Sequence, residues 1–214
     1  MINILYEDNH IIVAIKPVNV PMQADSSKDP DMLSLLKDYI KEKYQKPGNV
    51  YLGLVHRLDR PVGGVCVFAK TSKAASRLSE QVANHSLKKE YLAVLCANKI
   101  PNKGQLVDYL LKDSRTNMVK VDPKGKKAIL DYELVKSNDQ YSLVHIYLKT
   151  GRSHQIRVQF ASRNWPLFGD QRYNHKAKVG QQIALWAYRL TFNHPTLKTP
   201  MTFEAPIDRF PFNI

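Results

Sequence analysis

Residues able to carry out chemistry appear first in the pentapeptide HRLDR at residues 56–60, which runs into a glycine-containing turn. Arg57 and Arg60 flank Asp59. Because nearby cations favour the ionised form of a carboxyl group, we expect Asp59 to be a permanent anion. Such an anion, held in a cleft, can act as a nucleophile or as a general base. The alternative is that Asp59 only pairs with an arginine and fixes the turn.

A second group of polar residues is the heptapeptide GRSHQIR at residues 151–157, across an expected strand-to-helix junction. If the helix begins near Ser153, its free backbone N–H groups and the positive end of its dipole would form a site for a phosphate or carboxylate beside Arg152 and His154. Arg157 would follow one turn further along the helix. The alternative is a solvated basic helix end in which a backbone carbonyl satisfies His154.

The tetrapeptide KKEY at residues 88–91 comes just before a buried strand. Tyr91 is either an ordinary strand aromatic or a ring that stacks on an unpaired RNA base. In the second interpretation, Lys88 and Lys89 contact the phosphates of the RNA backbone. Residue type alone leaves both interpretations open.

Motifs for metals and cofactors are missing from the sequence. The seven histidines show neither the HExxH pattern nor the Cys/His spacing that is typical of metal sites. Neither glycine-rich loop of the nucleotide-binding folds occurs, and no GxSxG elbow is present to host a serine nucleophile. We therefore expect no metal, no nucleotide cofactor and no other cofactor.

Hydrophobic periodicity predicts the elements that must position these residues. Strands are predicted at residues 2–6, 11–15, 65–69, 91–97, 183–191 and 201–203 and as a hairpin within 128–148, and helices at 32–44, after Thr71 or Ser72, and after Ser153. The second helix would bury Ala74, Leu78 and Val82. The sheet should therefore be largely antiparallel. We find no internal repeat or linker, and we predict a single domain over residues 1–214.

The composition points to a polyanionic partner. Lys and Arg total 32 against 19 Asp and Glu, which gives a formal charge of +13, and the sequence pI is about 9.7. This excess makes a nucleic acid the leading candidate, although charge alone does not separate binders from other basic proteins.

Cysteine usage and hydropathy indicate the compartment. Cys66 and Cys96 lie in apolar stretches that resemble buried strands, so we expect free thiols in a reducing cytoplasm rather than disulfides. The N-terminus lacks the features of a secretory signal, and its longest apolar run, IIVAI, is too short to span a membrane. No long exposed apolar stripe is evident, so we expect a monomer.

The three motifs together resemble those of the RluA-type pseudouridine synthases. HRLDR is followed by a glycine turn, then by KKEYLAV and then by GRSHQIRV, in this order, and the similarity extends from LYEDNHIIVAIKPVNVP to MTFEAP. The resemblance implies an α+β fold, with a long mixed, mainly antiparallel β-sheet flanked by helices and loops and a central basic cleft. It also implies a catalytic domain without the additional N-terminal RNA-binding domain of some members.

The resemblance further implies an activity, the isomerisation of uridine to pseudouridine in structured RNA, either ribosomal or transfer RNA, without a cofactor. By matching positions, Asp59 is the catalytic aspartate, Tyr91 stacks on the uracil and Arg157 pairs with the aspartate. Arg57 matches the residue associated with displacing the target base, and Leu185 matches an apolar wall of the uracil pocket. Whether Asp59 attacks the sugar or removes a sugar proton stays open.

The sequence departs from the family pattern at two places. Val62-Gly63-Gly64 replaces the usual Thr-Ser-Gly run, and Trp186 stands where histidine is common. Both changes concern the wall of the cleft and therefore the identity of the substrate. Two alternative functions explain the sequence less well. An RNA-binding protein without turnover would have no need for an anionic Asp59 among the phosphates of the RNA, and a hydrolase acting on free nucleosides would leave the charge of +13 unexplained.

Overall fold

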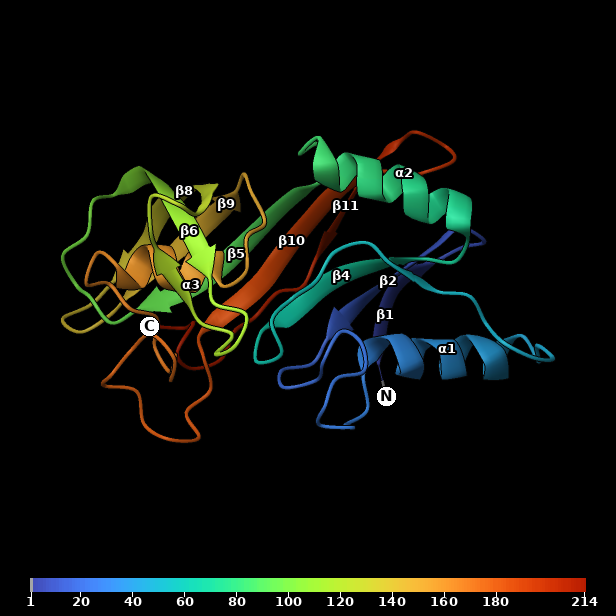
Figure 1. Ribbon diagram of the computed structural model, residues 1–214, viewed down its shortest axis with the longest axis horizontal. Coiled ribbons are helices and arrows are strands. Elements are labelled where there is room, and N and C mark those ends of the chain that lie inside the picture. Colours follow the sequence, from blue (N-terminus) through green and yellow to red (C-terminus); the bar gives the residue numbers. More distant parts are fainter. Residues whose placement is uncertain (1) are drawn as a thin grey trace. The chain divides into compact units, whose positions relative to one another are not determined.

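The computed structural model describes residues 2–214, and the chain forms two compact units (Figure 1). The first unit contains the chain up to Lys88 together with Arg189–Ala205, and the second contains Lys89–Tyr188 together with Pro206–Ile214. The α+β class is confirmed, since both units combine strands with helices. A single domain over residues 1–214 and a central basic cleft stay predictions.

The first unit consists of β-strands and two helices. Its elements are β1 (Asn3–Glu7), β2 (Ile11–Lys16), α1 (Met32–Lys43), β3 (Gly53–Leu54), β4 (Gly63–Ala69), α2 (Ser72–Ala83) and β11 (Pro200–Glu204). Strand β2 pairs antiparallel with β1 and with β4, and all seven residues of β4 are buried. The predicted hairpin and the predicted buried strand are therefore confirmed.

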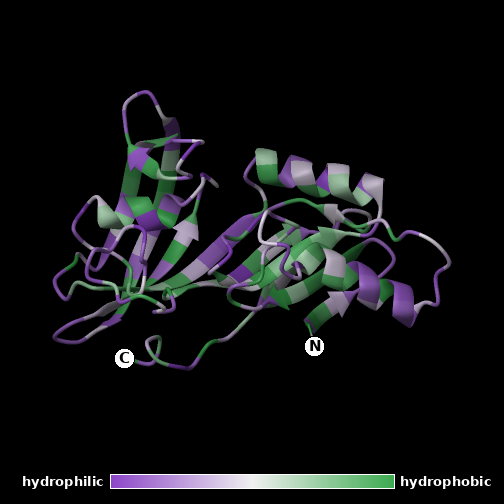
Figure 2. Ribbon diagram, turned by 60° about the horizontal axis from the view of Figure 1, so that its bottom comes forward, coloured by the Kyte–Doolittle hydropathy of each residue, from purple (hydrophilic) through white to green (hydrophobic). Residues whose placement is uncertain are grey.

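Capping residues and apolar spacing define both helices of the first unit. The Asp31 side chain accepts a hydrogen bond from the Ser34 amide at the start of α1, and Thr71 does the same for Ala74 at the start of α2. Hydrophobic and hydrophilic residues alternate along both helices (Figure 2). Helix α2 buries Ala74 and Leu78 as predicted, while Val82 is half-buried.

The second unit contains most of the sequence motifs. Its elements are β5 (Lys88–Leu95), β6 (Lys103–Lys112), β7 (Val119–Val121), β8 (Lys126–Ser137), β9 (Ser142–Leu148) and α3 (Gln155–Ala161). Strands β5, β9, β8, β6 and β7 lie in this order, and each pair is antiparallel. Strand β10 (Leu185–Asn193) contributes residues up to Tyr188 to this unit and the remainder to the first.

Three details of the second unit differ from the sequence prediction. Strands β6 and β7 were not predicted, and β5 begins at Lys88 rather than at Tyr91. Helix α3 begins at Gln155, two residues later than Ser153, because His154 precedes it in a left-handed conformation with φ of 50°. Val158 of α3 packs in a core cluster with Leu110 and Tyr173.

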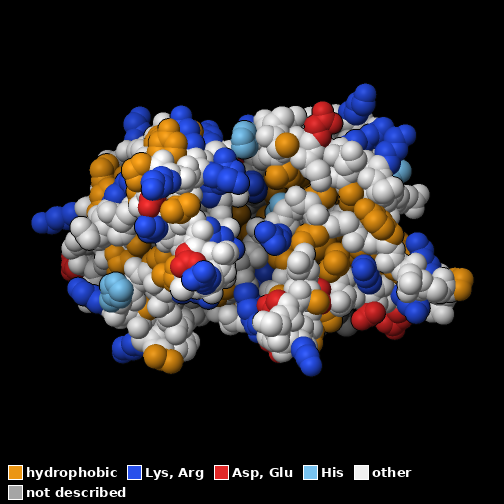
Figure 3. Space-filling model, in the orientation of Figure 1, with side chains coloured by type: hydrophobic (Ala, Val, Ile, Leu, Met, Phe, Trp, Pro, Cys, Tyr) orange, Lys and Arg blue, Asp and Glu red, His pale blue; other side chains and the backbone are white. Residues whose placement is uncertain are grey.

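The surface carries more basic than acidic side chains on the face that is shown. On the face shown in Figure 3, Lys and Arg outnumber Asp and Glu, in keeping with the formal charge of +13. Cys66 and Cys96 are free thiols as expected. Among residues 2–214, no helix has both the length and the hydropathy to cross a membrane.

Candidate active site

Asp59 lies in the first unit, on a turn that leads into strand β4. The Val62 amide donates a hydrogen bond of 2.9 Å to the Asp59 carbonyl, which closes the turn. The Asp59 side chain is half-buried, and Arg57 beside it is exposed. His56 anchors the preceding residues, because its Nε2 accepts a hydrogen bond of 3.1 Å from the Val67 amide of β4. The backbone around Asp59 is therefore fixed on both sides.

A buried lysine stabilises this turn through hydrogen bonds to backbone carbonyls. Lys16, at the end of β2, has no exposed surface, and its Nζ donates to the carbonyl oxygens of Pro17, Arg60 and Val62 at 3.0, 2.9 and 2.7 Å. Burial lowers the pKa of Lys16 to about 8, while Cys66 and Asp59 act in the opposite direction. Lys16 therefore connects the end of β2 to the backbone on either side of the turn. This role of Lys16 was not predicted from the sequence.

Arg60 forms ion pairs with carboxylates other than that of Asp59. Its guanidinium forms an ion pair with Asp29 and lies 3.6 Å from Asp25. From the sequence, both Arg57 and Arg60 were expected to interact with the carboxylate of Asp59. In the structure, the charge of Arg60 is directed to the loop that precedes α1.

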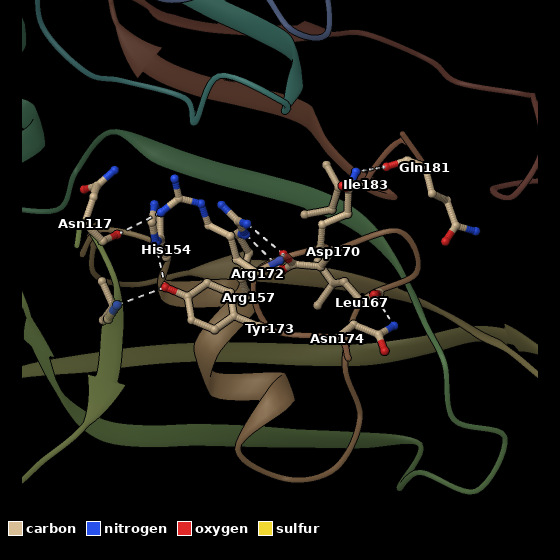
Figure 4. A network of polar contacts seen from close by, with 12 residues as sticks. Asn117, His154, Arg157, Leu167, Asp170, Arg172, Tyr173, Asn174, Gln181 and Ile183 are labelled. Atoms are coloured by element: carbon tan, nitrogen blue, oxygen red, sulfur yellow. Dashed lines mark hydrogen bonds and ion pairs between the residues drawn. The ribbon is translucent and has the colours of Figure 1, made fainter. Parts of the chain in front are cut away.

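In the second unit, Arg157 of α3 is held by a carboxylate that the sequence analysis did not consider. Its Nε and Nη2 donate to the two oxygens of Asp170 at 2.9 and 2.7 Å (Figure 4). Only 4% of Arg157 and 1% of Asp170 are exposed. Asp170 takes two of the five N–H donors of the guanidinium and fixes its plane.

Tyr173 lies against the guanidinium of Arg157. The guanidinium carbon lies 5.2 Å from the centre of the Tyr173 ring, in a cation–π contact. The Tyr173 hydroxyl accepts from the Val119 amide at 3.0 Å and lies 2.7 Å from Nδ1 of His154 (Figure 4). Burial raises the pKa of Tyr173, so this hydroxyl is protonated at neutral pH. Arg157 is thus fixed at its edge by Asp170 and at its face by Tyr173.

The rest of the GRSHQIR segment takes part in internal hydrogen bonds. The Gln155 side chain accepts from the Thr150 hydroxyl at 2.8 Å and from the Arg152 amide at 3.1 Å. Nε of Arg152 donates to the Lys127 carbonyl at 3.0 Å. In the structure, His154 forms a hydrogen bond with the Tyr173 hydroxyl. The alternative of a solvated helix end had predicted a backbone carbonyl as the partner of His154. A contact between Arg152 or His154 and RNA stays a prediction.

The remaining predicted site residues of the second unit lie on neighbouring strands. Tyr91 is 7% exposed on β5, beyond Lys88 and Lys89. Leu185, 4% exposed, begins β10 next to Ala184, whose carbonyl accepts the Val94 amide of β5 at 3.1 Å. Leu185 and Tyr91, the predicted wall residue and the predicted stacking aromatic, therefore lie on adjacent strands.

The backbone around Asp170 requires glycine before it. Gly169 has φ of 68°, and a Cβ there would collide with the carbonyl of Gln182. A side chain at residue 169 would displace the segment that carries Asp170. The available sequence feature was the dipeptide Gly169-Asp170, in which Asp170 lies thirteen residues after Arg157. This dipeptide belongs to no recognised motif, and the hydrophobic residues around it show no regular spacing.

Metal-ligating residues do not gather in the part of the chain described. No group of three or more His, Cys, Asp or Glu that could hold a metal ion occurs in residues 2–214.

Comparisons with known proteins show the family of this chain. A model of the RNA pseudouridylate synthase family matches residues 10–162. The dual-specificity RNA pseudouridine synthase RluA of Escherichia coli (strain K12) is 35% identical over 214 residues, covering 96% of this chain and 93% of that protein. The ribosomal large subunit pseudouridine synthase C of Buchnera aphidicola subsp. Baizongia pistaciae (strain Bp) is 33% identical over 217 residues, covering 96% of this chain and 67% of that protein.

A solved structure supports the fold independently. Human RNA Pseudouridylate Synthase Domain Containing 4 superposes with a TM-score of 0.82 at 22% identity, covering 99% of this chain and 90% of that chain. The resemblance of the three sequence motifs is thus confirmed by the family model, by close relatives and by the fold. The chain belongs to the RluA-type RNA pseudouridine synthases, enzymes that isomerise uridine to pseudouridine in RNA.

Proposed function

We propose that this enzyme isomerises specific uridines of structured RNA with Asp59 as its essential catalytic residue and without a cofactor. The N1–C1′ bond breaks, the uracil turns while it is held in place, and C5 joins C1′. Asp59 assists the departure of the base, as a nucleophile toward the sugar or as a base that removes a sugar proton.

The observation that carries this proposal is the support of the HRLDR turn. Lys16 is buried and binds the carbonyls of Arg60 and Val62, and the Val62 amide closes the turn at Asp59. A carboxylate on a backbone fixed in this way can be presented to a substrate with little loss of conformational entropy. This support is a reason to assign the catalytic role to Asp59.

The other site residues have proposed roles at the same uridine. Arg157 pairs with Asp59 and orients it, since a guanidinium fixed by Asp170 is pre-organised for a second carboxylate. Tyr91 stacks on the uracil, Leu185 forms an apolar wall, and Arg57 displaces the base from its helix. Moving a nucleotide out of a helix costs a few kcal/mol, which phosphate contacts can offset.

The proposed RNA is ribosomal or transfer RNA, with Lys88, Arg152 and His154 on its backbone. Ribosomal RNA is favoured because several relatives are named as ribosomal large subunit pseudouridine synthases. The +13 charge supports contact with phosphates. We further propose a cytoplasmic monomer, in keeping with the free thiols of Cys66 and Cys96.

The test begins with the substrate. Pseudouridines are mapped in RNA from cells with and without the gene, and a transcript that contains a site lost without the gene is labelled with tritium at uridine C5; we call it the assay transcript. The wild-type enzyme should release tritium from it, because hydrogen leaves C5 when C5 joins the sugar.

Asp59→Asn should abolish tritium release and keep most of the affinity for the assay transcript. Asp38→Asn, at an exposed carboxylate on α1, is the matched control and should release tritium at the wild-type rate. Normal release by Asp59→Asn would show that the catalytic assignment is wrong.

A further inference from the structure

Lys89 carries an amine in unusual surroundings. In the described chain, residues 2–214, its Nζ makes no hydrogen bond and no ion pair, whereas Nζ of the neighbouring Lys88 donates to the His85 carbonyl at 3.1 Å. The Lys89 side chain is half-buried, and this burial lowers the pKa of Lys89. Near neutral pH, a larger fraction of this amine is therefore neutral than in an exposed lysine.

The amine of Lys89 lies close to a glycine of the GRSHQIR segment. A Cβ at residue 151 would lie 3.0 Å from Nζ of Lys89, so Gly151 leaves the space that the amine occupies. Gly151 opens the segment that leads into α3, the helix that carries Arg157. The amine therefore lies beside the start of the GRSHQIR segment.

Strand geometry relates Lys89 to Tyr91. The two residues are separated by one position on β5, so their side chains point to the same face, and their Cα atoms are roughly 6.6 Å apart along an extended strand. Glu90 points to the other face, where it lies 2.9 Å from His145. The flexible four-carbon stem of Lys89 can therefore reach a ring that stacks on Tyr91.

We propose that Lys89 is a catalytic residue, which as a free amine removes the proton from C5 of the target uracil. The inference rests on the proposed function, in which Tyr91 holds the uracil. The sequence analysis placed Lys89 on the RNA backbone; an amine that is half-buried beside Gly151 is better suited to proton transfer than to a solvated phosphate.

The proton transfer balances within the reaction. When the N1–C1′ bond breaks, its electron pair stays on the uracil; when C5 joins C1′, C5 carries both the sugar and its original hydrogen. The Lys89 amine accepts this proton, and the electrons of the C5–H bond restore the C5–C6 double bond and return negative charge to N1. The ammonium then protonates N1, so the amine is regenerated and no proton is consumed.

The experiment compares Lys89→Met, Lys89→Arg and Gly151→Ala on the assay transcript, with hydrogen or deuterium at uridine C5. Lys99→Met, at an exposed lysine of the same unit, is the control for lost charge. Thermal unfolding of each variant verifies the fold. Gly151→Ala leaves every charge in place, but its Cβ would lie 3.0 Å from the Lys89 amine and would crowd it.

We expect Lys89→Met and Lys89→Arg to lower kcat by about 100-fold or more, because a guanidinium cannot act as a base. Both should show a larger deuterium isotope effect than the wild type, since proton removal becomes rate-limiting. Gly151→Ala should lower kcat to a smaller extent with the same change in isotope effect, and Lys99→Met should match the wild type.

Two outcomes would overturn the proposal. If Lys89→Arg keeps the wild-type kcat, Lys89 is a cationic phosphate contact. If kcat falls in the Lys89 variants without a larger isotope effect, the lysine acts before proton removal. In both cases tritium release by the wild-type enzyme shows that the proposed function holds, so the failure concerns Lys89 alone.

Discussion

Asp170 binds Arg157 through both of its carboxylate oxygens, at 2.9 Å from Nε and 2.7 Å from Nη2. Both residues are almost fully buried, and the carboxylate is fixed in turn by the Arg172 amide at 3.1 Å. Arg157 therefore has a permanent partner in the second unit. A guanidinium already held in one orientation loses little entropy when it meets another carboxylate.

Asp170→Asn should lower both turnover and stability. The substitution leaves the Arg157 charge buried with a neutral partner, and breaking a buried pair in this way costs about 3–5 kcal/mol of unfolding free energy. If Asp170 positions Arg157, kcat for tritium release should fall by at least about 10-fold at a temperature where the variant is folded, with KM changed much less. Chemical denaturation and steady-state kinetics measure the two effects.

The control for this prediction is the pair of Asp108 and Arg163 in the same unit. Arg163 Nη1 lies 2.9 Å from Asp108, but the pair is more exposed and Asp108 does not contact Arg157. Asp108→Asn should lower stability with kcat unchanged. Equal losses of kcat in the two variants would mean that Asp170 acts only through global stability.

Local patterns were sufficient to predict several elements. Helix α1 follows from the helical spacing of Met32, Leu36 and Ile40, which the structure buries. The buried strand β4 follows from its continuous apolar run. These elements are encoded by residues that are close in the sequence, so short-range periodicity was enough to find them.

Contacts between distant residues could not be predicted in this way. Lys16 looks like a lysine at a strand end, and only the fold brings the carbonyls of Arg60 and Val62 to its amine. Asp170 lies in a segment without periodicity, so its pairing with Arg157 has no local pattern. Strand β6 was missed because its outward side chains mix lysine, glutamine, valine and tyrosine, which weakens the alternation.

Lys16→Met should impair the Asp59 turn directly. The substitution removes the donor from three backbone carbonyls, and each buried acceptor left unsatisfied costs about 1–3 kcal/mol. We expect a lower unfolding temperature and a loss of kcat on the assay transcript, with RNA affinity largely retained. Lys41→Met, at an exposed lysine of α1, removes the same charge and should change neither quantity. Unchanged unfolding of Lys16→Met would contradict the supporting role of Lys16.

Glu7 should make the stability of the first unit depend on acid. Its carboxylate accepts hydrogen bonds of 2.7 Å from both Lys43 and Lys70. Burial alone would raise the pKa of Glu7, but hydrogen bonds from Lys43, Lys70 and Tyr44 outweigh it and lower the pKa from 4.5 to about 2. Because the folded pKa is depressed, the stabilisation is complete above pH 4.5 and is lost as the pH falls toward 2.

Glu7→Gln should therefore lower the unfolding free energy by about 2–3 kcal/mol at pH 7, at 1.36 kcal/mol per pKa unit and with some screening at the exposed Lys43. The difference from the wild type should shrink below pH 4.5. Glu42→Gln, at an exposed residue of α1, should show little difference at any pH. A wild-type advantage that stays constant from pH 7 to pH 3 would contradict the linkage.

Binding to RNA should weaken steeply with salt, and the slope should identify the backbone contacts. The logarithm of the binding constant falls by about 0.7 to 0.9 per phosphate contact for each unit of log salt concentration. With Asp59→Asn as a background without turnover, Lys88→Met and Arg152→Gln should each reduce the magnitude of the slope by about 1. Lys99→Met should leave the slope unchanged, because Lys99 has no proposed contact. If Lys88→Met and Arg152→Gln also leave the slope unchanged, the phosphates are bound by other cations of this basic surface.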